Sequence, residues 1–568
     1  MSNLGYPSSH QGGPKLGLVP FPESFVRRYR EAGYWTGRTL PAELQAARRE
    51  HGSAVALVTP EGVISYNDLF DEAETLAAGL LSTTSLAVGD AVMFQMGNVR
   101  ETVVAYLGSL FAGLKPVCTL PQHSVREIGL LAEHLNAKGL FVQADFGRGQ
   151  LVGNAKALLD RGAISEIVIA RGESFDGAYA FNDILDAGSA ADVSELPYED
   201  LPLDDVAVFQ LSGGTTGLPK VAPRLHEDYT YNSRAWAETL GYGPETVILY
   251  PLPVMHNAGI SLAIQPGLLS GSSIVLAPSA DVAGLIDLIE SERPDVLPLV
   301  PPALAIRLLE EPRARTADLS SIRDFIVGGQ VLPVAISERL RDVLGIRVRQ
   351  MFGMAEGMFT ITPALASEEI RHNTVGNAIS EADEIRILEP GFDVEVQRGE
   401  IGELCARGPY TIRGYYRAEA HNAAAFNVEG FYRTGDLARE HVIEGRSYFS
   451  IEGRIKDVIN RGTEKIHAEE VEELIVRHPD VVNAALVAMP DEVFGEKACV
   501  YLILESGSDP IDVAGLAQFL TSQGLAKYKL PERVEIVPSF PVSNVGKVSK
   551  KDLRADVEAK LANQGAHQ

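Results

Sequence analysis

Through the first three quarters of the 568-residue chain, short apolar runs rich in β-branched residues alternate with longer segments rich in Ala, Leu and Glu. The runs 54–59, 91–95 and 247–250 are of the first kind, and residues 66–81 are of the second. Such alternation favours α/β folding around largely parallel sheets. The chain is also too long for one hydrophobic core, so at least two domains are expected.

The pattern changes past about residue 451, where a charged stretch precedes a compact alternation of helix and strand. In this tail, residues 469–478 have the apolar spacing of a helix, and residues 484–489 and 499–504 are typical of buried strands. We therefore expect an α/β protein with a large N-terminal domain of parallel-sheet layers and a small C-terminal α+β domain of about 110 residues.

Composition excludes several classes of protein. A formal net charge of −26 argues against nucleic-acid binding, which needs clustered Lys and Arg. The three cysteines lie far apart without metal-ligand spacing, which indicates unpaired thiols in a reducing compartment. No apolar run reaches the ~18 residues that span a bilayer, and the Gly/Ser/Pro-rich start lacks a signal peptide. We expect a cytoplasmic protein with no membrane partner and a flexible N-terminal arm.

A glycine-rich loop, QLSGGTTGLPK at 210–220, follows an apolar run and precedes a helical-looking segment. Small residues let backbone N–H groups converge on phosphate oxygens, and the Lys220 ammonium adds a positive charge. In a Walker A loop Gly directly precedes Lys, whereas two residues separate Gly217 from Lys220, so an ordinary P-loop NTPase is disfavoured. The alternative is a flexible surface turn.

Four further motifs follow in order: FGMAE at 352–356, YRTGD at 432–436, GRIKD at 453–457 and GKVSK at 546–550. Together with the loop, they resemble the adenylate-forming superfamily of acyl-CoA synthetases, adenylation domains and luciferases. FPESFVRRYREAGYW at 21–35 and GPYTIRGYY at 408–416 look more closely like the stand-alone aryl-acid AMP ligases, which activate dihydroxybenzoate or salicylate.

This resemblance covers nearly the whole chain and implies its division. The expected parts are a flexible arm at 1–20, a large adenylation domain at 21–453, a hinge at 454–457 and a small mobile domain at 458–568. One site that serves two reactions in sequence is consistent with a domain that turns about a short hinge. The plainer interpretation of 454–457 is a charged linker.

The resemblance also implies ATP and Mg²⁺ as cofactors, with roles for the matching residues. The glycine-rich loop would bind the β- and γ-phosphates, 328–330 and Phe352 would flank adenine, and Asp436 would accept both ribose hydroxyls. Alone, an Asp after Gly is more often a turn residue. The expected nucleotide-binding residues are Ser212, Gly213, Gly214, Thr215, Thr216, Gly217, Lys220, Gly328, Gly329, Gln330, Phe352, Gly353, Met354, Ala355, Asp436, Arg454 and Lys456.

Three residues are candidates for the reaction itself. Glu356 matches the family's Mg²⁺ ligand, and His256 matches a histidine beside the acid. Lys547 matches a C-terminal lysine that reaches the acid carboxylate and the α-phosphate, and Gly546 would let its loop approach closely. The alternative for Lys547 is an ordinary solvent-exposed lysine, and the alternative for His256 is a buried histidine with a structural role.

The acid pocket is where the sequence departs from its resemblance. His256, Asn257, Ala258 and Ser261 match the aryl branch's pocket, in which Asn binds an ortho-hydroxyl group. Ala258, however, stands where those enzymes usually carry Tyr, and the run after Ser261 differs in sequence and apparent length. Loss of a ring leaves room for a larger or heteroaromatic acid.

These residues predict an enzyme that activates an aromatic carboxylic acid to its acyl-AMP and passes the acyl group to the phosphopantetheine thiol of a separate carrier protein. An aryl- or fatty-acyl-CoA ligase that uses free CoA shares every nucleotide motif. A non-catalytic nucleotide-binding protein is the third possibility, and the joint presence of Lys220, Glu356, Asp436 and Lys547 argues against it.

Overall fold

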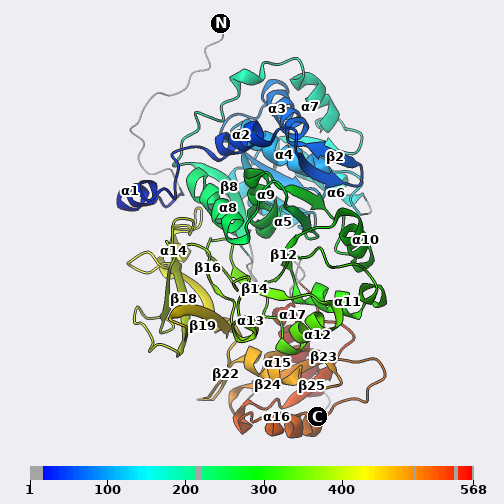
Figure 1. The fold of residues 1–568 in the computed structure, drawn as a ribbon, viewed down its shortest axis with the longest axis vertical. Coiled ribbons are helices and arrows are strands. Elements are labelled where there is room, and N and C mark those ends of the chain that lie inside the picture. Colours follow the sequence, from blue (N-terminus) through cyan, green and yellow to red (C-terminus); the bar gives the residue numbers. More distant parts are fainter. Residues whose placement is uncertain are drawn as a thin grey trace.

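The computed structural model describes residues 17–147, 149–212, 219–462, 464–491, 493–542 and 548–565. Within these ranges the strands form four sheets (Figure 1). Three of the sheets belong to the large upper and middle body in this view, and the fourth lies in the smaller C-terminal part at the bottom.

The first sheet is parallel at its centre and antiparallel at both edges. Its strands, in spatial order, are β16 (Asn377–Ala378), β15 (Phe359–Ile361), β14 (Val348–Gly353), β13 (Asp324–Val327), β12 (Val296–Val300), β10 (Val247–Tyr250), β11 (Ser273–Leu276), β1 (Val55–Thr59) and β2 (Gly62–Ser65).

The second sheet is parallel except for its last pair. Its strands, in spatial order, are β7 (Tyr179–Ala180), β6 (Glu166–Ala170), β5 (Gly139–Gln143), β3 (Ala91–Gln95), β4 (Lys115–Val117), β8 (Val206–Ser212) and β9 (Lys220–Leu225). Strands β3, β5 and β6 are buried along their whole length, which is why their sequences are continuous apolar runs without alternation.

Helices fill the space between the two sheets and cover their outer faces. The largest apolar cluster joins both sheets to α2 (Leu40–His51), α3 (Tyr66–Thr83), α4 (Arg100–Phe111), α7 (Phe181–Gly188), α8 (His226–Leu240) and α9 (Gln265–Ser270). The outer face of the first sheet packs on α10 (Val282–Glu292), α11 (Pro302–Glu310) and α12 (Val334–Leu344), and that of the second on α5 (Val125–Leu135) and α6 (Gln150–Asp160). This is a layered α/β arrangement.

The third sheet is antiparallel and lies beside the first sheet (Figure 1). It contains β17 (Glu384–Leu388), β18 (Ile401–Arg407), β19 (Tyr432–Ile443) and β20 (Arg446–Arg454), with α14 (Glu419–Ala425) between β18 and β19 and α13 (Glu368–Asn373) before the sheet. The short turn Ile455–Asp457 then leads from β20 to the C-terminal part.

The C-terminal part is built on a mixed sheet with helices on both faces. Its strands are β22 (Glu464–Ile466), β21 (Ile459–Arg461), β24 (Gly495–Leu504) and β23 (Val481–Asp491), and β25 (Arg533–Ile536) pairs with β24. Helices α15 (Ala468–Ile475) and α16 (Val513–Ser522) pack on one face, and α17 (Lys550–Gly565) packs on the other. The predicted fold class, a large α/β domain with a small α+β domain, is confirmed.

One local prediction is wrong. The glycine-rich loop does not lead into a helix: it joins β8 to the antiparallel strand β9, with Ser212 paired to Lys220, and α8 begins only after β9. Strand β9 contains Pro223, which discourages a strand assignment, but β9 is the last strand of its sheet, where Pro is tolerated.

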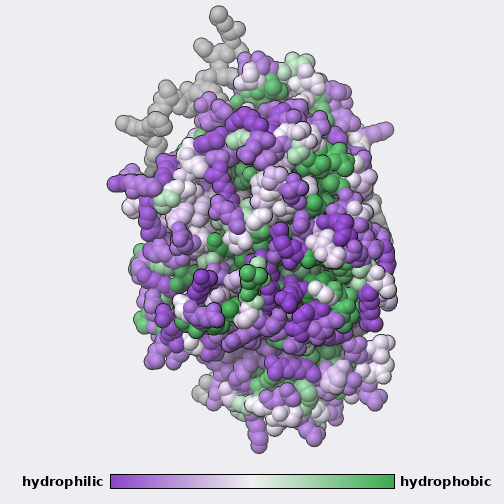
Figure 2. Space-filling model, viewed as in Figure 1, coloured by the Kyte–Doolittle hydropathy of each residue, from purple (hydrophilic) through white to green (hydrophobic). Residues whose placement is uncertain are grey.

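The surface in Figure 2 is mostly hydrophilic, with hydrophobic residues interspersed among charged ones. Across the described ranges, no helix is both long and apolar enough to cross a membrane. All three cysteines are buried and form no disulfide.

The N-terminal segment that includes α1 (Glu23–Glu31) binds the large body together. Residues 1–16 of the predicted arm lie outside the described residues, whereas the Gly17 carbonyl already accepts a hydrogen bond from the Arg417 amide at 2.8 Å. Trp35 is buried, and its indole N–H donates a hydrogen bond to the Pro409 carbonyl oxygen at 2.9 Å. The Arg30 guanidinium forms an ion pair, 2.5 Å between N and O, with the buried carboxylate of Glu227 at the start of α8. The segment therefore connects α8 to the loop that follows β18.

We expect Trp35→Ala to destabilise the fold by about 3–5 kcal/mol, because it removes a large buried ring that contacts Phe21 and Tyr29. The matched variant Trp35→Phe keeps an aromatic ring and loses the N–H donor, so its effect should be smaller, about 1–3 kcal/mol. Thermal unfolding of the three proteins tests this expectation, and equal midpoints for Trp35→Ala and the unaltered protein would contradict it.

Candidate active site

Two predicted nucleotide-binding segments lie at neighbouring strand ends. Residues 328–330 follow β13, and Phe352 lies near the end of β14, its parallel neighbour in the first sheet. Gly329 has φ +87°, and a Cβ at Gly328 would lie 2.6 Å from Met351 Cγ. Small residues are therefore required there. The carboxyl ends of parallel strands are where open α/β sheets bind ligands.

Glu356 is the central carboxylate of the site. It is 3% exposed and lies in the turn after β14. Its Oε1 accepts hydrogen bonds from the Tyr415 hydroxyl and, at 3.3 Å, from the Tyr432 hydroxyl, and the two phenol oxygens are 2.8 Å apart. Burial, and then the charge of Glu356, raise the pKa of Tyr415. Burial raises the pKa of Tyr432 as well, so both phenols stay protonated and act as donors. Both donate to Oε1, and no hydrogen bond from the described residues reaches Oε2.

Lys220 reaches the same place from β9. Its ammonium lies over the Tyr415 ring, 5.1 Å from the centroid. Burial lowers the pKa of Lys220, while Glu356 acts to raise it and Arg454 to lower it. Lys220, Glu356 and Arg454 thus interact in one region, although 234 positions separate the first from the last in sequence. Residues 213–218 of the predicted phosphate loop lie outside the described residues.

Asp436 and Arg454 face each other across β19 and β20. The Asp436 carboxylate is buried, and its Oδ1 lies 2.8 Å from Arg454 Nε. Burial lowers the pKa of Arg454, but the charges of Asp436 and Asp457 outweigh it, so the pKa is raised overall. The site therefore combines two buried carboxylates with two cations.

The Lys456 side chain is exposed, like that of Arg454. The Lys456 carbonyl accepts a hydrogen bond from Arg554 of α17 at 3.5 Å, and Arg554 also forms an ion pair with Asp457. The segment between β20 and β21 is thereby connected to the last helix of the C-terminal part. Lys547 lies outside the described residues, so its predicted position is untested.

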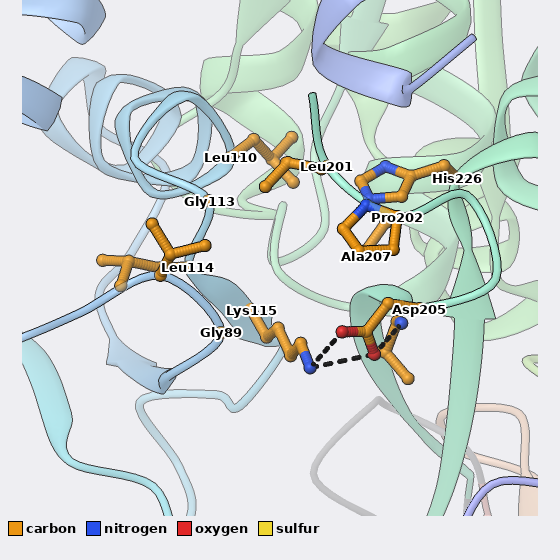
Figure 3. A pocket seen from close by; sticks show the side chains of 12 residues that line it. Gly89, Leu110, Gly113, Leu114, Lys115, Leu201, Pro202, Asp205, Ala207 and His226 are labelled. Atoms are coloured by element: carbon orange, nitrogen blue, oxygen red, sulfur yellow. Dashed lines mark hydrogen bonds and ion pairs between the residues drawn. The ribbon is translucent and has the colours of Figure 1, made fainter. Parts of the chain in front are cut away.

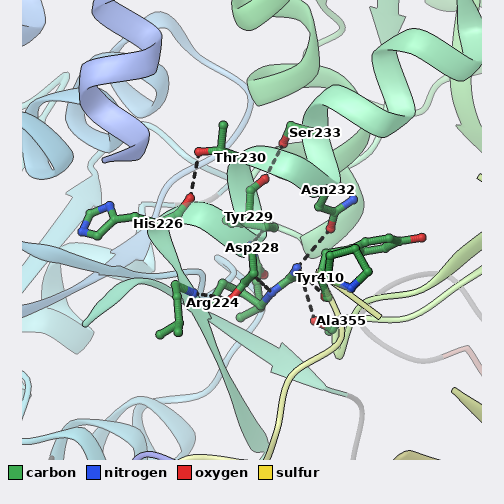
Figure 4. A network of polar contacts seen from close by, with 12 residues as sticks. Arg224, His226, Asp228, Tyr229, Thr230, Asn232, Ser233, Ala355 and Tyr410 are labelled. Atoms are coloured by element: carbon green, nitrogen blue, oxygen red, sulfur yellow. Dashed lines mark hydrogen bonds and ion pairs between the residues drawn. The ribbon is translucent and has the colours of Figure 1, made fainter. Parts of the chain in front are cut away.

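The turn that carries Glu356 is fixed by a buried arginine (Figure 4). Arg224 is 0% exposed and forms an ion pair with Asp228 at 3.0 Å. Its other N–H groups donate to the Asn232 side chain at 3.2 Å and to the carbonyls of Ala355 at 3.2 Å and Tyr410 at 3.0 Å. Burial raises the pKa of Asp228 to about 6, although Arg224 acts in the opposite direction.

Glycine is required beside Glu356. Gly357 has φ +88°, and a Cβ there would lie 1.7 Å from the Tyr410 carbonyl oxygen. The Glu356 carbonyl accepts a hydrogen bond from the Ile412 amide at 2.8 Å. The turn is therefore packed directly against the segment that follows β18.

The predicted acid-pocket residues lie together between the sheets. Asn257, Ala258 and Ser261 are buried, and the Ser261 hydroxyl donates to the Asn257 carbonyl at 2.7 Å. His256 is less buried, and its Nδ1 accepts a hydrogen bond from the Ala258 amide at 3.3 Å. Residues Gly259–Ile264 form a π-helical turn, which holds more residues per turn than an α-helix. The run after Ser261 that departs from the resemblance begins within this turn.

A chain of polar contacts reaches from the acid pocket to Arg224. The Gln210 amide donates to the Tyr229 hydroxyl at 2.8 Å, and that hydroxyl donates to Asn257 Oδ1 at 3.4 Å. The Arg224 guanidinium lies 4.3 Å from the centroid of the Tyr229 ring. Because Oδ1 of Asn257 accepts from Tyr229, its Nδ2 group is left as a donor for a ligand.

A cavity of about 30 Å³ beside the Lys115–Asp205 ion pair contains none of the predicted site residues (Figure 3). This volume suits a water molecule rather than a substrate. Its lining includes Leu110, Leu114 and Leu201, and we assign it to packing.

Comparison with known proteins agrees with this site. The AMP-binding enzyme family matches residues 44–416, and the C-terminal domain of AMP-binding enzymes matches residues 470–547. The chain belongs to the AMP-binding enzyme family, which confirms the resemblance inferred from the motifs.

Individual relatives match along almost their whole length. Pyochelin synthase PchD of Pseudomonas aeruginosa is 40% identical over 95% of this chain and 96% of its own. The 2,3-dihydroxybenzoate-AMP ligase of Bacillus subtilis is 38% identical over 96% of this chain and 98% of its own. The structure of apo MbtA from Mycobacterium smegmatis is similar with a TM-score of 0.72 and 33% identity, covering 95% of this chain and 98% of that one.

We expect Arg224→Met to destabilise the protein by about 3–5 kcal/mol, because it leaves the Asp228 carboxylate buried without its cation. The double variant Arg224→Met/Asp228→Leu removes both charges and should recover part of this loss in thermal unfolding. It should not recover Mg·ATP affinity, measured by calorimetry, because nothing then binds the Ala355 carbonyl beside Glu356. Full ATP affinity in the double variant would contradict the positioning role of Arg224.

Proposed function

We propose that this protein activates an aromatic carboxylic acid with ATP, releases pyrophosphate, and transfers the acyl group from acyl-AMP to the phosphopantetheine thiol of a separate carrier protein. The observation that carries the proposal is the convergence of Lys220, Glu356 and Arg454, joined through the Arg224 network to the Asn257 pocket. Family membership, and relatives whose names include a 2,3-dihydroxybenzoate-AMP ligase, support it.

In the first step, a carboxylate oxygen of the acid forms a bond to the α-phosphorus of ATP. The bond from that phosphorus to the bridging oxygen breaks, and pyrophosphate leaves with the electron pair. Two anions must approach each other, so catalysis depends on cations placed around the phosphates. Among the residues that the structure describes, Lys220 near Glu356 and Arg454 beside Asp436 can supply such positive charge.

Glu356 suits the proposed Mg²⁺ ion. Magnesium is commonly bound by one or two carboxylates together with substrate phosphates rather than by a cage of protein ligands. Glu356 Oε2 accepts no hydrogen bond from the described residues, and no cluster of three acidic, His or Cys ligands occurs among them. We therefore assign Mg²⁺ to Glu356 and the ATP phosphates, where it would neutralise charge.

With the ATP phosphates placed beside Glu356, the other proposed nucleotide contacts follow. Asp436 would accept the two ribose hydroxyls, and adenine would lie between Phe352 and residues 328–330. Residues 212–220 would bind the β- and γ-phosphates. Lys547 would reach the carboxylate and the α-phosphate, and turning about residues 454–457 would replace it by the thiol in the second step.

Asn257 and Ala258 define the kind of acid that we propose. The Asn257 Nδ2 donor would bind an acceptor beside the carboxylate, either an ortho-hydroxyl oxygen or a ring nitrogen. Ala258, in place of the Tyr expected from the resemblance, would admit a ring larger than that of salicylate. His256 would lie at the entrance of this pocket, near the carboxylate.

ATP–pyrophosphate exchange with a panel of acids tests the proposal. The panel contains benzoate, salicylate, 2,3-dihydroxybenzoate, bicyclic heteroaromatic carboxylates with a ring nitrogen beside the carboxyl group, and fatty acids. We expect exchange with an aromatic acid that has an ortho acceptor and at least tenfold less with benzoate. Exchange with no acid, or with fatty acids alone, would overturn the proposal. Offering CoA and a phosphopantetheinylated carrier side by side then identifies the acceptor.

The role of Lys547 separates the two steps. Lys547→Ala should reduce adenylate formation by at least 100-fold, since it removes a cation from the attacking carboxylate and the α-phosphate. Thiol transfer from a supplied acyl-adenylate should change by less than threefold, because in that step the thiol sulfur bonds to the acyl carbon, AMP leaves, and no pyrophosphate is displaced. Equal losses in both half-reactions would contradict this role. Lys551→Ala, at a nearby lysine of α17, is the control.

A further inference from the structure

Helix α14 lies directly against the tyrosine that binds Glu356. The Asn422 side chain accepts a hydrogen bond from the Tyr415 amide and donates one to the Tyr415 carbonyl, both at 2.8 Å. Ala425 packs in the same apolar cluster as Tyr415 and Tyr432. The helix is therefore fixed to the wall of the site, and any side chain that it directs there has a defined position.

His421 is that side chain. Its ring lies against the Tyr415 ring, with 5.1 Å between centroids and an angle of 53° between planes. Its Nε2 atom is buried and has no hydrogen-bond partner in the described part of the chain. A buried polar atom without a partner is unfavourable, so it calls for an explanation.

The surroundings of His421 indicate what binds there. The charges of Lys220 and Glu356 both interact electrostatically with the His421 imidazole. Lys220 also lies over the Tyr415 ring, which the His421 ring contacts. Burial lowers the pKa of His421, Lys220 lowers it further, and Glu356 opposes them. The ring is then neutral near pH 7 and carries one N–H group, which can donate to an anion without adding charge.

We propose that His421 is a phosphate-binding residue whose Nε2–H group donates a hydrogen bond to the β- or γ-phosphate of ATP and to the departing pyrophosphate. The inference rests on the proposed function, because it places these phosphates beside Lys220 and Glu356. Hydrogen bonds to charged groups contribute about 1.5–3 kcal/mol, so losing the donor should weaken binding about 10-fold or more.

Three substitutions at one position test the assignment. His421→Phe keeps a planar ring and removes the donor. His421→Gln brings an amide N–H group close to where Nε2 lies, whereas His421→Asn carries a similar amide on a shorter side chain. Calorimetry with Mg·ATP, Mg·pyrophosphate and AMP requires no acid, so it does not depend on which acid the enzyme activates.

We expect His421→Phe and His421→Asn to weaken binding of Mg·ATP and Mg·pyrophosphate about 10-fold, with AMP affected less than twofold. His421→Gln should restore most of the loss. Unchanged ATP affinity in His421→Phe, equal weakening of ATP and AMP, or failure of His421→Gln to restore binding would overturn the inference. If His421→Phe does not fold, the Gln and Asn variants still decide it.

These outcomes are distinct from failure of the proposed function. An unaltered protein that binds ATP but shows no exchange with any acid contradicts the proposed function and leaves the binding comparison intact. An unaltered protein that exchanges with an aromatic acid, while His421→Phe binds ATP normally, contradicts only the role of His421.

Discussion

The geometry of the site depends on the burial of one guanidinium group. Removing a charge from water costs several kcal/mol, and this is offset only when acceptors surround it. Arg224 takes its acceptors from α8, which follows it directly, and from carbonyls more than a hundred residues further along the chain. The cation is therefore satisfied only when the Glu356 turn and the segment after β18 are both in place. Burial of Arg224 therefore fixes the positions of α8, the Glu356 turn and the segment after β18 relative to one another.

The convergence of the motif residues could be predicted from the sequence because the motifs are short, occur in order and lie at strand ends. Arg224 could not, since an arginine among apolar residues gives no sign of distant carbonyl acceptors, and arginine is rarely fully buried. Tyr415 and Tyr432 lie inside motifs that we noted, but their shared contact with Glu356 is visible only in three dimensions. Strand β9 was missed because Pro223 is acceptable only at a sheet edge.

The passage from the large body to the C-terminal part includes residues that we propose bind the nucleotide. Arg454 ends β20 and forms an ion pair with Asp436, while two residues later the Lys456 carbonyl and Asp457 contact Arg554 of α17. A ligand that engages Asp436 therefore alters the partner of the residue next to the turn. In this way occupancy of the site and orientation of the small part can be coupled through a single ion pair.

The π-helical turn at Gly259–Ile264 separates variation in one segment from the rest of the fold. It absorbs an additional residue within one turn, while β10 before it and β11 after it keep their parallel pairing in register. The Glu356 turn and the Asp436–Arg454 pair lie on other elements and do not depend on the length of this turn. A substitution within this turn can therefore reshape the surroundings of Asn257 without shifting the strands that carry the Glu356 turn and the Asp436–Arg454 pair.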